Sequence, residues 1–347
     1  MFRKEFVFSL IFIILLFAAV TYLLAQDCKQ DHQKISRSVE NYTAQYSYFN
    51  INNISTIIYN DGRADIALTG NSGFEYPKGS GKTAVYQSGL LWGGKVNNHI
   101  RAGGSRYRTG LQPGRAFPGG SSENLNSESV RVYRVRPDYL TADLSTESSI
   151  ENKTITEVFD QYEKDWKEWP AVWGAPFEDV NDDGNYNWEI DIPGVPGADQ
   201  TLWLVANDID SVQAKFVLGS PSMGIEMQVT IWGYKSDSPL DNVIFKKYKL
   251  INKSNYSFEE MYLGMWTDHD IGDAGNDFAG CDTTINLMFG YNADVYDRQY
   301  GYNPPSVGYK LLQGPIVDAN SSNFALFDGR RITGKKNLPM TAFTHFI

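Results

Sequence analysis

The chain has 347 residues and a net charge of −10, and this acidic balance excludes a nucleic-acid-binding role based on a basic surface. Aromatic residues make up 14% of the chain and glycine is abundant, with 31 residues, which favours short strands and turns over long helices. Two cysteines in so long a chain exclude a disulfide framework, so a hydrophobic core must stabilise the fold.

Residues 1–25 have the pattern of an export signal. Arg3 and Lys4 precede an apolar run over residues 6–24 that ends at Ala25, as in secretory signal peptides. We therefore expect cleavage after Ala25 and a secreted or cell-surface protein. The run is about as long as a bilayer span, so an uncleaved membrane anchor is the alternative. A bridge between Cys28 and Cys281 remains open.

Residues 26–140 form the first β-rich region. Apolar residues alternate on either side of the turn Asn60-Asp61-Gly62, which is a hairpin signal, and residues 84–92 and 129–135 also have strand patterns. The stretch Gly79–Thr83 resembles a phosphate-binding loop, but the first glycine of that motif and the following helix are missing. The sequence therefore predicts no nucleotide site.

Residues 141–170 form a helical connector. Apolar side chains recur at three- and four-residue steps from Ile150 to Trp166, which predicts a helix of about five turns with one apolar face. Ser148 or Ser149 is expected to cap it, and Pro170 ends it.

Residues 171–347 form the second β-rich region. Strand patterns occur at residues 202–205, 225–234, 243–251 and 261–266, with turn signals between them. Antiparallel strands of this kind are typical of β-sandwiches. The whole chain is therefore expected to be mainly β, with antiparallel β-sandwich-like regions and one helix between them.

An acidic loop at residues 179–191 has the spacing of a calcium-binding loop. Oxygen-bearing side chains occupy its first, third, fifth and ninth positions, and Gly184 supplies the sharp turn. The twelfth position carries Ile190 in place of the usual glutamate, with Asp191 beside it. The predicted calcium ligands are Asp179, Asn181, Asp183, Asn185, Asn187 and Asp191. The alternative is a solvated turn, since the same residue types favour turns.

A second acidic cluster directly follows the last predicted strand. Its candidate calcium ligands are Asp268, Asp270, Asp273 and Asp277. The spacing is less regular than in the first loop, but the residue types suit the same hard cation. Whether the two acidic loops form one site is left open.

Several short motifs resemble a family of secreted proteins. They include Tyr59-Asn60-Asp61-Gly62, Ser88-Gly89-Leu90-Leu91-Trp92-Gly93 and Gly280-Cys281-Asp282-Thr283. The chain resembles the N-terminal region of large uncharacterised secreted proteins of the Bacteroidetes and Ignavibacteria type. The resemblance implies further β-sandwich modules and a C-terminal domain for type IX secretion. The apolar ending at residues 344–347 is expected of a chain that continues.

Two functions fit these features. The first is a secreted or cell-surface structural or binding protein with calcium-stabilised loops and no catalysis, whose partner is a cell-surface glycan or protein. The alternative is a polysaccharide-active hydrolase that uses paired carboxylates. The sequence contains no GxSxG elbow and no metalloprotease motif, which favours the first. Membrane contact is expected only through the signal segment, if it remains uncleaved.

Overall fold

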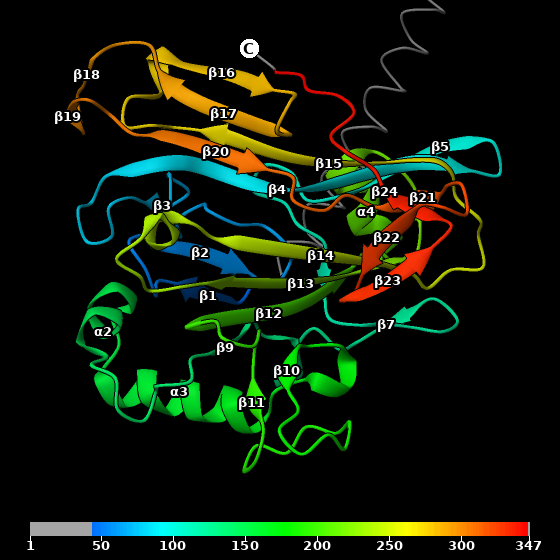
Figure 1. Cartoon of the computed structure of the whole chain (residues 1–347), viewed down its shortest axis with the longest axis horizontal. Coiled ribbons are helices and arrows are strands. Elements are labelled where there is room, and N and C mark those ends of the chain that lie inside the picture. The colour runs from blue at the N-terminus through cyan, green and yellow to red at the C-terminus, as the bar shows by residue number, and fades with distance from the viewer. Residues whose placement is uncertain (1–43, 346–347) are drawn as a thin grey trace, which may run out of the picture.

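The computed structural model describes residues 44–345, and antiparallel sheets dominate this range. Figure 1 shows the sheets as successive layers, with α2 and α3 at one end of the molecule. The predicted mainly β, sandwich-like fold is confirmed. The predicted signal segment and Cys28 lie outside the described residues, so the structure does not address the bridge to Cys281.

The central sheet is built around β12, which has strand neighbours along both edges. β13 and then β14 follow on one side, and β9 and β6 pair with β12 on the other. All eight residues of β12 are buried, because packed side chains cover both faces of the sheet. The strands are β6 (Gln112–Pro113), β9 (Tyr133–Val135), β12 (Gln200–Asn207), β13 (Ile225–Gly233) and β14 (Phe245–Asn252).

The second sheet lies against the central sheet, and the two enclose the main core. Its strands are β3 (Phe74–Glu75), β4 (Thr83–Val96), β5 (His99–Gly104) and β15 (Glu259–His269). Leu90 and Trp92 of β4 belong to the same buried cluster as Leu202 and Leu204 of β12. The short pair β1 (Tyr46–Phe49) and β2 (Thr56–Tyr59) adds Phe49 to this cluster. Burial of this apolar surface is the main stabilising contribution to the fold.

An outer sheet of three strands covers the far side of the second sheet (Figure 1). It consists of β16 (Asp277–Asp282), β17 (Leu287–Asn292) and β20 (Ser306–Lys310). The His269 ring at the end of β15 meets the Tyr309 ring of β20 edge-on. A Cβ atom added to Gly290 of β17 would lie 2.5 Å from that histidine ring. Glycine at this position therefore allows the two layers to approach closely.

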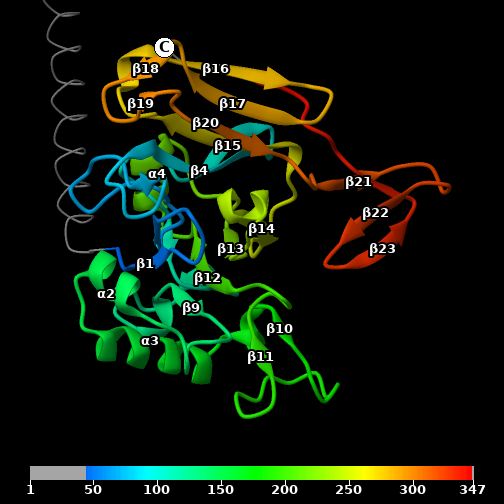
Figure 2. The ribbon, with the colours of Figure 1, turned by 60° about the vertical axis from the view of Figure 1, so that its left-hand side comes forward.

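Five small two-stranded ribbons complete the strands of the described range. They are β7 (Ala116–Phe117) with β8 (Ser121–Ser122), β10 (Phe177–Glu178) with β11 (Ile192–Pro193), β18 (Tyr296–Asp297) with β19 (Gly301–Tyr302), β21 (Ile316–Asp318) with β24 (Lys335–Asn337), and β22 (Phe324–Phe327) with β23 (Arg330–Thr333). The ribbon β22–β23 stands away from the sheets in Figure 2. Lys247 and Lys249 of β14 both pair with Asp328 at its tip.

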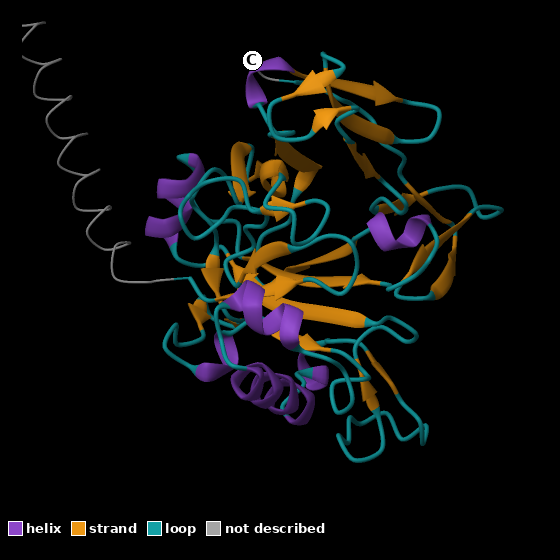
Figure 3. Cartoon of the chain, turned by 90° about the vertical axis from the view of Figure 1, so that its left-hand side faces the viewer, coloured by secondary structure: helices purple, strands orange, loops and turns teal. Residues whose placement is uncertain are grey.

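The predicted single helix is two helices, which is a correction. α2 (Ser145–Glu151) ends at Asn152, whose left-handed φ of 52° breaks the helix, and α3 (Ile155–Lys167) begins after Thr154. Asparagine adopts this backbone conformation more readily than most residues. The predicted apolar face is real in α3, where Val158 and Tyr162 are fully buried. Figure 3 shows the helices outside the strand layers.

Helix α4 (Ser211–Leu218) was not expected from the sequence. Its N-cap is Asp210, whose side chain accepts hydrogen bonds from the backbone N–H groups of Val212 and Gln213. Four short 3-10 turns occur in the described range: η1 (Glu128–Val130), η2 (Ala171–Trp173), η3 (Pro239–Asn242) and η4 (Ala274–Asn276).

Strands from the two predicted β-rich regions pair with one another. β4 of the first region pairs with β15 of the second over residues 85–95. β6 and β9 of the first region pair with β12 of the second. Both sheets of the sandwich therefore contain strands from each side of the helical connector. Among residues 44–345, no helix has the length and apolar character needed to cross a membrane.

Candidate functional site

The first acidic loop projects from the ribbon β10–β11 and curls around the carboxylate of Asp179. The two oxygens of Asp179 accept hydrogen bonds from the backbone N–H groups of Asp183, at 3.2 Å, and Gly184, at 2.7 Å. Asn181 donates from Nδ2 to Oδ2 of Asp183 at 2.9 Å. Three predicted calcium ligands are thus drawn together at one exposed position. Gly184 has a φ of 78°, which glycine adopts at little cost.

Asp191 closes the base of this loop. Its side chain is buried, and its two oxygens accept hydrogen bonds from the backbone N–H groups of Val180, at 3.0 Å, and Asn187, at 2.7 Å. Asn185 donates its backbone N–H to Oδ1 of Asp183 at 2.7 Å, and this bond lowers the pKa of Asp183. Asp191 and Asn187 therefore fix the loop, while Asp179, Asn181 and Asp183 present oxygens at its tip.

The second acidic loop connects β15 to β16 and holds its carboxylates by separate contacts. Oδ2 of Asp270 accepts a hydrogen bond from the Ser72 hydroxyl at 3.1 Å. Asp273 caps the short turn η4 and pairs with the exposed Arg298 at 3.2 Å. Burial raises the pKa of Asp270, and the neighbouring carboxylate of Asp268 adds to the effect.

Asp277 is the most unusual carboxylate of this loop. Its Oδ2 accepts a hydrogen bond from the backbone N–H of Ile271 at 2.7 Å. Its Oδ1 atom is buried and has no hydrogen-bond partner among the described residues. Burial is the main cause that raises the pKa of Asp277 to about 6, and the charges of Asp270, Asp297 and Asp273 raise it further. A buried, unpaired carboxylate oxygen is costly without a cation or a proton donor.

Asp297 belongs to the same cluster, although it was not among the residues expected from the sequence. It is buried, and its Oδ2 accepts a hydrogen bond from the backbone N–H of Asp273 at 2.8 Å. Gly272 passes so close that an added Cβ atom would lie 2.1 Å from Oδ1 of Asp297. Asp297 is the last residue of β18, in a different segment of the chain, so no local spacing links it to residues 268–277.

Aromatic rings lie beside the first carboxylate of the second loop. The Tyr107 hydroxyl hydrogen-bonds to Asp268, while burial raises the pKa of that carboxyl. The Tyr107 ring centroid lies 5.0 Å from that of Trp266 on β15 and 6.2 Å from that of Tyr86 on β4. Tyr107 is half exposed. The end of β15 therefore combines two aspartates with an aromatic surface.

The two acidic loops are separate sites. The first projects beyond the central sheet with β10 and β11, whereas the second adjoins β16 on the opposite side of the molecule (Figures 1 and 2). In the part of the chain that the structure describes, no three His, Cys, Asp or Glu side chains are grouped as a metal site. Any calcium ligand sphere here must include amide or backbone oxygens, as calcium loops commonly do.

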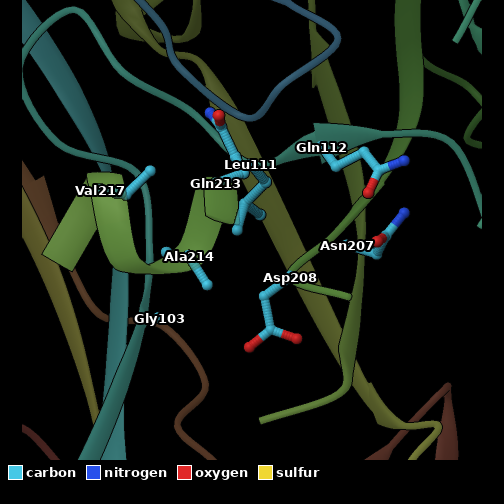
Figure 4. A pocket seen from close by; sticks show the side chains of 9 residues that line it. Gly103, Leu111, Gln112, Asn207, Asp208, Gln213, Ala214 and Val217 are labelled. Carbon is cyan, nitrogen blue, oxygen red and sulfur yellow. The ribbon is translucent and has the colours of Figure 1, made fainter. Parts of the chain in front are cut away.

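Figure 4 shows a small cavity between α4 and strands β5, β6 and β12. Its lining includes Leu111, Gln112, Asp208 and Val217, and its volume is about 10 Å³. This is at the lower limit for one water molecule. The cavity is too small for an organic ligand.

Comparison of the chain with protein-family models, with curated proteins and with solved structures finds no match in any of the three.

Proposed function

We propose that this chain is a secreted or cell-surface structural or binding protein whose two acidic loops are stabilised by calcium. The observation that carries this proposal is the buried, unpartnered Oδ1 atom of Asp277, with Asp270, Asp273 and Asp297 nearby. A divalent cation would give this oxygen a partner and offset the repulsion between the carboxylates. The exposed tip with Asp179, Asn181 and Asp183 is the second proposed site.

Export and the family resemblance rest on the sequence. The basic start and apolar run of residues 1–25 support translocation, and the short motifs support kinship with secreted Bacteroidetes and Ignavibacteria proteins. Calcium is abundant outside the cell and would stabilise the protein by mass action, since the folded loops bind it and the unfolded chain does not.

The test is thermal unfolding in calcium, in magnesium and in a chelator. Calcium should raise the melting temperature, and magnesium should raise it less because it demands a more rigid octahedral shell. The variants are Asp179→Ala/Asp183→Ala in the first loop and Asp277→Asn in the second. Asp182→Asn and Asp294→Asn are matched controls, since each removes an exposed charge near one loop and neither residue is a proposed ligand.

Asp277→Asn gives the sharpest outcome because its effect should change sign with calcium. In chelator, the neutral side chain relieves repulsion, so the variant should melt above the wild-type chain. In calcium, it should gain less stability than the wild-type chain and fall below it. If chelator leaves the wild-type melting temperature unchanged, the calcium proposal is wrong.

A hydrolase is the second candidate, favoured by Asp268 and Asp270 beside the rings of Tyr107 and Trp266. Paired carboxylates next to an aromatic surface suit glycoside hydrolysis. The check is release of reducing ends from polysaccharides by the wild-type chain and by Asp268→Asn and Asp270→Asn. Activity that both variants abolish, while their melting temperatures in calcium remain normal, would favour the enzyme.

A further inference from the structure

The exposed face of the outer sheet has aromatic rings in a row across two strands. Phe278 of β16 lies directly opposite Tyr291 of β17, and Gly280 lies opposite Phe289. Phe278 is 55% exposed and Tyr291 is 41% exposed. We call Phe278, Tyr291 and Phe289 the aromatic platform. The opposite face of this sheet, with Gly290 and Tyr309, packs on β15 and is not available.

The Phe289 ring of the platform lies down on the neighbouring strand. A Cβ atom added to Gly280 would be 2.6 Å from the tip of the Phe289 ring, so this ring rests on the glycine of the neighbouring strand. The Tyr291 ring is tilted by 37° from Phe289, and the Phe278 ring by 27° from Tyr291, with centroids 6.1 Å apart in both pairs. The planes of neighbouring rings in the platform are therefore similarly oriented.

The residues of β20 directly opposite the platform are uncharged. Ser306 of β20 lies opposite Tyr291, and Gly308 lies opposite Phe289. The next row across the sheet has one acidic and one basic residue, Asp282 and Lys310, whose charges balance. The whole chain has a net charge of −10. An anionic partner would be repelled, and a nucleic acid would need several lysine or arginine contacts that this face lacks.

The size of the platform also restricts the partner. An aromatic side chain contributes at most about 250 Å² of surface, and the three rings are only partly exposed. Their sum is well below the roughly 800 Å² that each partner buries in a stable protein–protein interface. A narrow, uncharged ligand fits this face better than a second folded protein.

We propose that the aromatic platform binds an uncharged polysaccharide chain. Sugar rings present apolar C–H faces that pack on aromatic faces, while their hydroxyl groups reach polar atoms at the rim, here the Tyr291 and Ser306 hydroxyls. This inference rests on the proposed binding role and names its surface and its class of partner. None of the three platform residues is a proposed calcium ligand, although Phe278 directly follows Asp277.

The experiment is a pull-down of the purified full chain on insoluble cellulose and chitin, with affinity electrophoresis in xyloglucan and glucomannan. Calcium is kept saturating throughout. Binding to at least one of these neutral polysaccharides is expected, and it should not weaken as salt is raised. Retention only on an anionic polysaccharide such as alginate, or retention on none, overturns the proposal.

Three variants locate the binding surface. Phe278→Ala/Tyr291→Ala should weaken binding about tenfold, since two of the three aromatic contacts are lost. Gly280→Ala keeps every aromatic residue but displaces the Phe289 ring, so it should also weaken binding. The control Tyr262→Ala/Tyr302→Ala removes two rings that are 71% and 76% exposed outside the platform, and it should bind like the wild-type chain.

The proposal is wrong if Phe278→Ala/Tyr291→Ala binds polysaccharide as well as the wild-type chain does. It is also wrong if the control variant loses as much affinity as Phe278→Ala/Tyr291→Ala. Circular dichroism of each variant confirms that it is folded before binding is measured. The calcium proposal is judged separately from melts without polysaccharide, so either proposal can fail while the other stands.

Discussion

Arginine side chains of β9 and of the segments on either side of it are paired with acidic residues of the helices. Arg134 is buried against Glu151, and Nη1 of Arg136 lies 2.8 Å from Oε1 of Glu147. Nε of Arg131 lies 2.7 Å from Oδ1 of Asp165. These pairs attach α2 and α3 to the central sheet. Loss of one member of such a pair leaves an uncompensated buried charge, which is strongly destabilising.

Glu123 provides a test of pH dependence at the residue scale. Its carboxylate accepts hydrogen bonds from Nε and Nη2 of Arg115, at 3.0 and 2.9 Å, and from the Ser129 hydroxyl at 2.7 Å. Burial raises the pKa of Glu123, but these bonds outweigh it and hold the pKa below its usual value. The charged form is therefore the stabilised one.

Glu123→Gln is expected to lower the free energy of unfolding by about 1.5–3 kcal/mol at neutral pH, since hydrogen bonds to a charged group are lost. The wild-type advantage should be complete above the unfolded-state pKa of about 4.3 and disappear as pH falls through the lower folded-state pKa. Urea unfolding of the wild-type and Glu123→Gln chains across this pH range measures the difference in unfolding free energy. Glu178→Gln, at an exposed position, is the control, and a difference that is independent of pH contradicts the prediction.

At the scale of elements, the long strands were predictable and the short ones were not. Residues 225–234 were expected as a strand and form β13 (Ile225–Gly233), because alternating apolar residues mark a regular pleat. Two-residue strands such as β6 and β10 are too short for any alternation. The helix was misjudged at Asn152, because the apolar periodicity continues across the break.

The break between α2 and α3 has a local signal in Thr154 and Glu157. The Thr154 side chain accepts a hydrogen bond from the backbone N–H of Glu157, and the Glu157 carboxylate accepts one from the backbone N–H of Thr154. This reciprocal pair is a capping box, which marks a helix start. The capping-box residues can be read from the sequence, but they fall inside the single helix that was expected to start at Ser148 or Ser149.

Thr154→Ala is expected to cost about 1 kcal/mol of unfolding free energy because the first turn of α3 loses its cap. Thr154→Ser keeps the capping oxygen and should cost far less. Chemical denaturation of the three chains gives the comparison. Equal losses in both variants would show that the methyl group of Thr154, and not the cap, matters.

In the acidic loops, ligands that are close in sequence were predictable, whereas a residue that is distant in sequence was not. The first loop was predictable because Asp179, Asn181 and Asp183 lie within one short turn. In the second loop, the position of Asp297 beside the other carboxylates depends on how β18 and β19 pack against residues 268–277. This packing cannot be predicted from the spacing of residues in the sequence. The calcium prediction itself stays a prediction until the melts are made.

At the scale of the whole molecule, the two β-rich regions share their sheets. The long pairing of β4 with β15 joins residues that are more than 160 positions apart, as in the pair Lys95 and Glu259. Pairings between such distant segments have no local signature, so chain order alone suggested two successive units. The structure instead places strands of both regions around one core.

The shared core predicts that residues 44–140 do not fold alone. Without the rest of the chain, β4 loses β15, β6 and β9 lose β12, and Leu90 and Trp92 lose their cover from the central sheet. The isolated fragment should show no cooperative thermal transition by circular dichroism. Mixing it with residues 141–345 should restore a cooperative transition, because the missing strands and apolar contacts are then supplied in trans. A cooperative melt of the fragment by itself would mean that the first region is an independent domain, and that the pairing of β4 with β15 adds to a fold already formed.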